Sequence, residues 1–327
     1  MVYDAGISAD IADLFSDLAT FATGSPGWTD DGLTGGNRLG LHKNNVYVQF
    51  RWDGSTPANV GIYQSLGIVA VGTDPGLQTD DSGNGAVSGT NATLATERHV
   101  PLVNSSMNRW FFEDDNYIHI VAETSSGEYR HFGFGELLET GDADYTGGEY
   151  IYGWLYDLAG AGGSGSSALR LDSSHLLDGR ASGTGLNVRV ATIHIEGLPG
   201  QAGVTKWGVV WGSNSTQGND TAGNPRSFVQ GGFRAGPYAR ALGRFSSDPS
   251  EKGLLHFYPI RCFYREGSNV RDLGTMPAVA GCNIEFFEGG QEVSVDGGSE
   301  TWVVFPSKVK QAVGSRHQGI AYQKVTT

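Results

Sequence analysis

The stretch from Trp110 to Leu137 is the feature that most constrains the fold. It contains three runs in which apolar and polar side chains alternate, as they do in half-buried β-strands. Two short polar segments separate the runs, at 114–116 and 125–127, and both have the composition of tight turns. The pattern predicts a three-stranded antiparallel meander, which we expect to be the rigid centre of the fold. The side chains predicted to be buried are Phe112, Ile118, Ile120, Phe132 and Phe134.

One helix is expected near the N-terminus, where apolar residues recur at steps of three and four and therefore share one helix face. Ser8 or Asp10 can cap its start, and Gly24 marks its end. Trp28 follows, and we expect it to be anchored in the core. The apolar face consists of Ile11, Leu14, Phe15, Leu18 and Phe21 or Ala22.

Most of the remaining chain has the alternation and the turn residues of β-strands. Two polar loops rich in Gly, Ser, Thr, Asn and Asp interrupt it, at 72–95 and 212–226. The predicted fold is α+β and predominantly β, with antiparallel sheets or a sandwich, one N-terminal amphipathic helix and long glycine-rich loops. The expected strands outside the meander cover 38–42, 46–52, 62–71, 149–156, 187–196, 206–212, 254–263, 283–287, 292–295, 301–305 and 319–324.

A short run of glycine and serine at 159–167 offers a boundary between two halves of the chain. If it is a linker, it separates a helix plus antiparallel β domain at 1–158 from a C-terminal β-rich domain at 168–327. The same run is equally typical of a surface loop, in which case the two halves form one continuous fold. A chain of 327 residues is compatible with both arrangements.

The composition of the chain argues against several classes of protein. Glycine is unusually frequent, at 50 of 327 residues, but it is scattered and only 11 prolines accompany it, which excludes collagen. A net charge of −13 disfavours binding to nucleic acid or to an anionic membrane surface. No stretch approaches the ~20 apolar residues of a membrane span. The first residues lack a basic region and an apolar core, so we expect no secretory signal and synthesis in the cytoplasm.

His119 and His131 are the most suggestive pair of polar residues. They are predicted on neighbouring strands of the meander, where they could face each other. A metal site or an acid–base role would need a third group, which Glu113 or Glu123 could supply. The favoured interpretation is two strand histidines with ordinary hydrogen bonds.

The two cysteines, Cys262 and Cys282, lie in no Cys/His cluster, so zinc is not indicated. Small buried thiols are the favoured interpretation, and the spacing leaves a disulfide between them open.

Other signals of chemistry are weak. The acidic clusters at 30–31, 80–81, 113–115 and 142–144 lack the alternating oxygen ligands of a calcium loop. The run at 159–167 lacks the flanking strand and helix of a nucleophile elbow. Seven Trp, 13 Tyr and 15 Phe favour packing in cores and interfaces over a row of rings for sugar binding. The sequence therefore predicts no catalytic residue, no cofactor site and no metal site, and so no enzyme.

Several blocks of the sequence resemble a family of structural proteins from tailed-bacteriophage virions. The most specific block is the meander, YIHIVAETSSGEYRHFGFGEL at 117–137, followed by GGEYIYG at 147–153. The helix followed by Gly27-Trp28 is similar too, as are LGTMP at 273–277, TWVVFP at 301–306 and GIAYQK at 319–324. The resemblance covers both ends and the middle of the chain, whereas 160–250 has no counterpart. It brings no catalytic residues with it.

This resemblance implies a non-enzymatic virion protein of the tail, the baseplate or the tail tip. Such a protein packs against copies of itself and against other virion proteins, typically in a symmetric ring. The loops 72–95 and 212–226 hold too few apolar groups to offset their own ordering entropy. We therefore expect intersubunit contacts at one or both loops and at a chain terminus.

Two other functions are kept as alternatives. A receptor- or carbohydrate-binding module of the virion would use the loops at 72–95 or 212–240 to bind a host surface glycan, with exposed aromatic rings stacking on the sugar. A hydrolase of the cell envelope would need a cleft with two carboxylates about 5–10 Å apart, which the sequence alone cannot place. The hydrolase is the least favoured of the three.

Overall fold

The computed structural model describes residues 2–24, 27–32, 37–52, 58–65, 98–114, 116–138, 146–153, 189–196, 207–211, 226–230, 257–266, 269–284, 286–306 and 318–324. Most of these residues lie in β-strands, and the one α-helix among them, α1 (Ile11–Gly24), lies near the N-terminus. The predicted fold class, mostly antiparallel β with one N-terminal helix, is confirmed.

The larger of two sheets has thirteen strands. In chain order they are β1 (Val2–Ser8), β7 (Met107–Asp114), β8 (Tyr117–Ser125), β9 (Glu128–Glu136), β10 (Thr146–Tyr152), β11 (Arg189–Glu196), β12 (Trp207–Trp211), β13 (Arg226–Gln230), β14 (Phe257–Glu266), β15 (Asn269–Asn283), β16 (Gln291–Val295), β17 (Glu300–Pro306) and β18 (Gln318–Lys324). In space the order is β1-β7-β8-β9-β10-β11-β12-β13-β14-β15-β18-β17-β16. The pair β12 and β13 is parallel, and the other neighbours are antiparallel.

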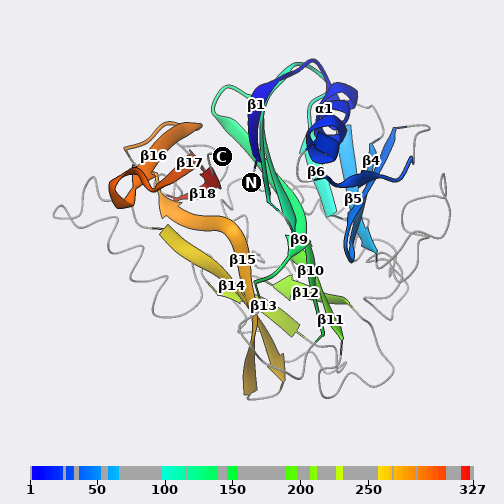
Figure 1. Ribbon diagram of the computed structural model, residues 1–327, viewed down its shortest axis with the longest axis vertical. Helices are drawn as coiled ribbons and strands as arrows, with labels where there is room; N and C mark the ends of the chain where they lie inside the picture. Colours follow the sequence, from blue (N-terminus) through cyan, green and yellow to red (C-terminus); the bar gives the residue numbers. More distant parts are fainter. Residues whose placement is uncertain are drawn as a thin grey trace, which may run out of the picture.

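The smaller sheet has five antiparallel strands in chain order. They are β2 (Thr29–Asp30), β3 (Arg38–Lys43), β4 (Val46–Trp52), β5 (Ala58–Ser65) and β6 (Arg98–Leu102). This sheet and α1 lie on one side of β9 and β10, and β16 to β18 lie on the other side (Figure 1).

Strands β7, β8 and β9 form the predicted meander. Asp114 pairs with Tyr117, and Ser125 pairs with Glu128, so each connection is a tight turn. Gly127 adopts a φ of 74° in the second turn, a conformation that suits a residue without a Cβ. All five side chains that the alternation places in the core are fully buried. The predicted burial of the meander is therefore confirmed.

The meander carries an apolar layer on each of its faces, because side chains of a strand alternate between them. On one face, Phe111 and Phe132 pack with α1 and the smaller sheet. On the other face, Phe112 packs with side chains of the C-terminal strands. The helix-side core consists mainly of Ile11, Leu14, Phe15, Leu18, Phe21, Trp28, Leu41, Val48, Phe50, Phe111, Ile118, Ile120, Phe132 and Phe134. The C-terminal core consists mainly of Phe112, Val121, Tyr129, Tyr150, Tyr152, Ile260, Cys262, Leu273, Met276, Val279, Val303, Phe305, Ile320 and Tyr322.

Helix α1 begins where its sequence predicts. The backbone N–H of Asp13 donates to Asp10 Oδ1 at 2.9 Å, so Asp10 is the N-cap. Asp13 in turn accepts from the backbone N–H of Ala9 at 2.7 Å. The apolar face of α1 covers the smaller sheet, where Phe15 stacks on Trp52 with ring centroids 4.7 Å apart.

The two edge strands of the larger sheet, β1 and β16, approach each other over the C-terminal core. Lys324 Nζ on β18 lies 4.5 Å from the ring centroid of Tyr3 on β1 and 2.6 Å from Glu292 Oε1 on β16. The first and last described residues therefore lie close together, as the chain ends in Figure 1 also show.

One predicted strand is wrong. A strand was expected at 283–287, but β15 already ends at Asn283. Beyond it the Phe287 backbone N–H donates to the Ile284 carbonyl, which turns the chain. The strands that the sequence does not predict are β1, β2, β6, β13 and most of β15.

Several predicted features lie outside the described residues. These are the loops at 72–95 and 212–225 and the run at 159–167. The division into 1–158 and 168–327 stays a prediction, although β10 and β11, on either side of the run, pair in one sheet.

Candidate functional site

His119 lies on β8 and points into the C-terminal core, where it is fully buried. Its Nδ1 is 3.0 Å from the Tyr152 hydroxyl, and its Nε2 is 2.8 Å from the backbone carbonyl of Pro277. The ring also stacks against Tyr117, with centroids 4.7 Å apart. Both ring nitrogens of His119 are therefore engaged.

His131, on the neighbouring strand β9, repeats this arrangement. Its Nδ1 is 2.9 Å from the Tyr322 hydroxyl, and its Nε2 is 2.9 Å from the backbone carbonyl of Pro306. The Tyr322 hydroxyl lies 3.5 Å from that of Tyr152. The two histidines are thus joined through two tyrosines into one buried chain, the His–Tyr chain.

The partners of each imidazole assign its tautomer. A carbonyl oxygen only accepts, so Nε2 carries the hydrogen and Nδ1 accepts from the tyrosine hydroxyl. Burial lowers the pKa of His119 and of His131 to about 4, so both rings are neutral at pH 7. Neither ring has a nitrogen lone pair free for a metal ion or a substrate proton. The favoured interpretation, two strand histidines with ordinary hydrogen bonds, describes them correctly.

The carboxylates expected beside the histidines lie elsewhere. Glu123 accepts from Asn108 Nδ2 and from the backbone N–H of Gly127, both at 2.7 Å, and so organises the β8–β9 turn. Glu113 is on β7 next to Phe112, which puts it on the helix side of the meander. Neither residue completes a metal or acid–base site with the histidines.

Glu113 is buried, and its carboxyl has only the indole N–H of Trp28 beside it among the described polar side chains, too far from ideal geometry for a full hydrogen bond. Neither carboxyl oxygen has a hydrogen bond within the described residues, and the indole nitrogen of the nearby Trp28 has none either. Burial raises the pKa of Glu113 to about 8, against the opposing effect of Lys43. The side chain is therefore mostly protonated at neutral pH. The indole of Trp28 is a donor only and cannot exchange a proton with this carboxyl, so the pair does not form an acid–base site.

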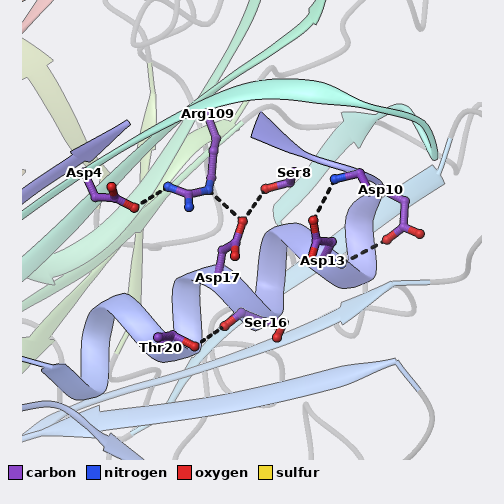
Figure 2. Close-up of polar contacts among 9 residues, drawn as sticks. Asp4, Ser8, Asp10, Asp13, Ser16, Asp17, Thr20 and Arg109 are labelled. Carbon is purple, nitrogen blue, oxygen red and sulfur yellow. Dashed lines mark hydrogen bonds and ion pairs between the residues drawn. The ribbon is translucent and has the colours of Figure 1, made fainter. Parts of the chain in front are cut away.

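The most connected polar cluster joins β1 and α1 to the meander (Figure 2). Arg109 on β7 pairs with Asp4 on β1 through Nη1, and Arg109 Nε donates to Asp17 Oδ2 on α1 at 2.8 Å. Ser8, considered as a cap, instead donates to Asp17 Oδ2 at 2.8 Å. The guanidinium also lies 4.5 Å from the ring centroid of Phe111. Its donors are bound to protein carboxylates, so the cluster fastens elements together.

The remaining acidic clusters show no ligand set. Asp31 pairs with His42, across β2 and β3 of the smaller sheet. Residues 80–81 and 142–144 lie outside the described residues. Within the part of the chain that the structure describes, no three His, Cys, Asp or Glu side chains come together in a way that would hold a metal ion.

Cys262 and Cys282 are free, buried thiols, as the favoured interpretation predicted. They belong to different apolar clusters, because Cys262 lies in the C-terminal core and Cys282 packs with Ile284 and Ala321. Burial raises the pKa of both thiols far above the usual value, which removes their nucleophilicity at neutral pH.

The surface offers a clearer candidate than the interior. Strand β1 is an edge of the larger sheet, and its only strand partner among the described residues is β7. It is seven residues long, contains no Pro or Lys, and exposes 68% of Ile7. Asp4, its one charged residue, forms an ion pair with Arg109. Natural edge strands usually carry a free charge, a proline or a bulge that blocks further pairing, and β1 lacks the first two.

Sequence reasoning missed this edge and the tyrosines of the His–Tyr chain. The segment 2–8 shows little alternation, so its sequence does not predict a strand. Tyr152 and Tyr322 were quoted only as parts of family-like blocks. Nothing in their local sequence indicates that their hydroxyls meet.

Comparisons with known proteins add no identity. No family model matches the chain, and no curated protein matches it. Among the described helical residues, none forms a helix of the length and apolarity that a membrane span requires.

Proposed function

We propose that this chain is a non-enzymatic structural protein of a tailed-bacteriophage virion, a component of the tail, baseplate or tail tip. It works by packing against copies of itself and against other virion proteins. The observation that carries the proposal is the unprotected edge strand β1, with Ile7 68% exposed. The family resemblance of the meander and of the C-terminal blocks supplies the setting.

An open edge of this kind suits a subunit that adds to a neighbour. Among the described residues, the N–H and C=O groups along the outer side of β1 have no strand partner, and a strand from another copy can satisfy them. In a ring, each copy uses two different surfaces, so one edge can meet a distinct surface on the next copy. The buried polar groups described above serve the fold, which leaves the surface to carry the function.

Mass spectrometry of purified particles tests the setting. The expected result is that the protein is present in multiple copies in washed virions. Its absence from virions, together with its presence in lysates of infected cells, would overturn the proposal.

A variant tests the edge. Ile7→Lys places a charge on β1, and light scattering after size exclusion should show a smaller assembly than that of the unchanged protein. Leu138→Lys is the matched control, because Leu138 is 60% exposed but lies outside β1. Equal assembly in all three proteins would remove β1 from the interface.

A further inference from the structure

We propose that the His–Tyr chain is a proton-operated latch: it holds the C-terminal strands β15, β17 and β18 on the meander, accepts one proton without breaking, and releases those strands when it accepts a second. The inference concerns the fold and does not rest on the proposed function.

The latch joins parts of the chain that are far apart in sequence. The carbonyl that His119 contacts belongs to β15, 158 residues further on. The carbonyl that His131 contacts ends β17, 175 residues further on, and its tyrosine partner Tyr322 is on β18. Three hydrogen bonds therefore run from the meander to the C-terminal strands, and a fourth, between His119 and Tyr152, joins β8 to β10. Both imidazoles sit at the interface between the two layers of the C-terminal core.

In the neutral latch every hydrogen is assigned. Each Nε2–H donates to a carbonyl, and each Nδ1 accepts the hydroxyl hydrogen of its tyrosine. Both hydroxyl hydrogens of Tyr152 and Tyr322 thus point outward, toward the histidines. The two hydroxyl oxygens face each other at 3.5 Å with no hydrogen between them. This gap is the one place in the His–Tyr chain where a further hydrogen bond can form.

One proton from solvent fits into this arrangement. When it binds Nδ1 of His119, that nitrogen becomes a donor to the Tyr152 oxygen, and the Tyr152 hydroxyl hydrogen turns into the gap toward Tyr322. Tyr322 continues to donate to His131. The same rearrangement runs in reverse if His131 is protonated first. Every donor keeps an acceptor, and the latch carries a single positive charge.

A second proton cannot be accommodated in the same way. Both Nδ1 atoms now donate inward, so the two hydroxyl hydrogens share one gap and one of them loses its acceptor. Two positive charges also lie in a buried layer, which costs much more than one. The doubly protonated latch is therefore strained in hydrogen bonding and in charge at once.

Among the described residues, no carboxylate lies beside either imidazole to relieve this charge. The titratable groups that pack around the His–Tyr chain are Tyr117 on β8, Tyr150 on β10, Cys262 on β14 next to Tyr150, and Cys282 on β15 next to Tyr322. Phe305 on β17 is apolar. The one charged group that acts on either imidazole is Arg130, which repels a charge on His131.

The direction of the pH dependence follows from the proton count. A histidine released from the latch regains its ordinary pKa of 6.5, whereas burial lowers that of both closed histidines to about 4. The open form therefore binds more protons between these values, and acid favours it. The opening constant rises about tenfold per pH unit for each histidine that is neutral when closed and protonated when open.

Amide hydrogen exchange of the whole protein tests the latch. Rates corrected for intrinsic chemistry are compared at pH 7, 5.5 and 4.5 for β15, β17 and β18, with β3 and β4 of the smaller sheet as the internal control. We expect opening of the C-terminal strands to increase at least about tenfold per pH unit, while β3 and β4 change little. An equal increase in both sets would overturn the proposal.

Two further measurements keep the test specific. Ring-nitrogen NMR of the unchanged protein at pH 7 should show both histidines protonated at Nε2 alone, and a hydrogen on Nδ1 of either would contradict the assignment. Tyr322→Phe removes the oxygen on which a protonated His131 depends, so its C-terminal strands should open at a higher pH than those of the unchanged protein. Tyr117→Phe is the matched control, since its ring stacks on His119 without a bond to it. If both variants open at the same pH, the chain does not act as a latch.

Discussion

The two faces of the meander bury polar groups in opposite ways. In the C-terminal core, His119 and His131 are fully buried and each has two partners within 3.0 Å. In the helix-side layer, Glu113 is just as fully buried, but its carboxyl makes no well-formed hydrogen bond within the described residues and has only the Trp28 indole as a weak polar neighbour. The difference teaches that burial alone does not decide what a polar side chain contributes to a core. The geometry of its partners decides it, and the partners come from distant parts of the chain.

The two faces also respond to pH with opposite signs. The folded histidines bind protons less readily than unfolded ones. Their contribution to the stability of the folded protein is therefore fully present above pH 6.5 and is lost as the pH falls toward 4. Folded Glu113 binds its proton more readily than the ordinary carboxyl with its pKa of 4.5. Its contribution is present below that pH and is lost as the pH rises through about 8.

The largest expected effect comes from removing a side chain of the helix-side core. Phe132→Ala should lower the free energy of unfolding by about 3–5 kcal/mol, because a fully buried ring is replaced by a cavity. Urea denaturation at pH 6 measures the loss. Leu138→Ala serves as the control, since that side chain is exposed and should cost little. A loss under about 1 kcal/mol for Phe132→Ala would mean that this layer is not a packed core.

The neighbouring residue probes the other face. A Cβ at Gly133 would lie 2.7 Å from the Ile118 carbonyl, 2.7 Å from the Tyr152 ring and 3.0 Å from His119 Nδ1. Gly133→Ala should therefore cost about 1–3 kcal/mol through overpacking and should disturb the bond between His119 and Tyr152.

The check on Gly133→Ala combines thermal unfolding with the ring-nitrogen NMR signal of His119. Gly24→Ala is the matched control, because a Cβ there meets nothing within 4 Å. Unchanged stability together with an unchanged His119 signal would show that this face has more space than the structure indicates.

At the buried carboxyl of Glu113 the expected effect depends on pH and is small at pH 5. Glu113→Gln removes the titrating group while keeping its size. The free energy of unfolding of the variant, relative to that of the unchanged protein, should therefore increase as the pH rises. The gain is at most about 1.4 kcal/mol for each pH unit between 5 and 8. Urea denaturation of both proteins at pH 5, 6.5 and 8 gives the difference. Parallel pH profiles would mean that Glu113 is ionised in the folded protein already at pH 5.

The smallest effect is expected at the helix that covers the helix-side core. Asp10→Ala removes the N-cap of α1 and should cost about 1 kcal/mol, whereas Asp10→Asn keeps an oxygen that accepts from Asp13 N and should cost less. Thermal unfolding of the two variants side by side measures this. Equal losses would indicate that charge near the helix start, rather than the capping hydrogen bond, matters at this position.

Local patterns predicted local structure well. Alternation between 110 and 137 predicted the three strands, the two turns and the five buried side chains, and the spacing of Ile11, Leu14 and Leu18 predicted α1. Alternation did not predict which core each face would meet. Alternation predicts burial for both Phe112 and Phe132, yet the two side chains lie in different layers.

Partners far away in sequence were beyond local patterns. His131 meets Tyr322, 191 residues later, and no periodicity reports such a contact. The incomplete hydrogen bonding of the Glu113 carboxyl could not be predicted from the sequence either, because it depends on where the fold places Trp28. The strand at 269–283 was overlooked because Gly274, Pro277 and Gly281 are residues that usually mark turns.

The construction of the C-terminal core has a consequence for how the chain is synthesised. The meander and β10 supply one wall of this core, and the opposite wall is complete only with Tyr322, which follows Tyr152 by 170 residues. A ribosome that adds about 5–20 residues per second needs about 10–30 s to cover that distance. Until β14 to β18 have been synthesised, the apolar wall around Phe112 and Val121 lacks the cover that these strands supply in the finished core. We therefore expect the nascent chain to depend on chaperones at this stage more than the finished protein does.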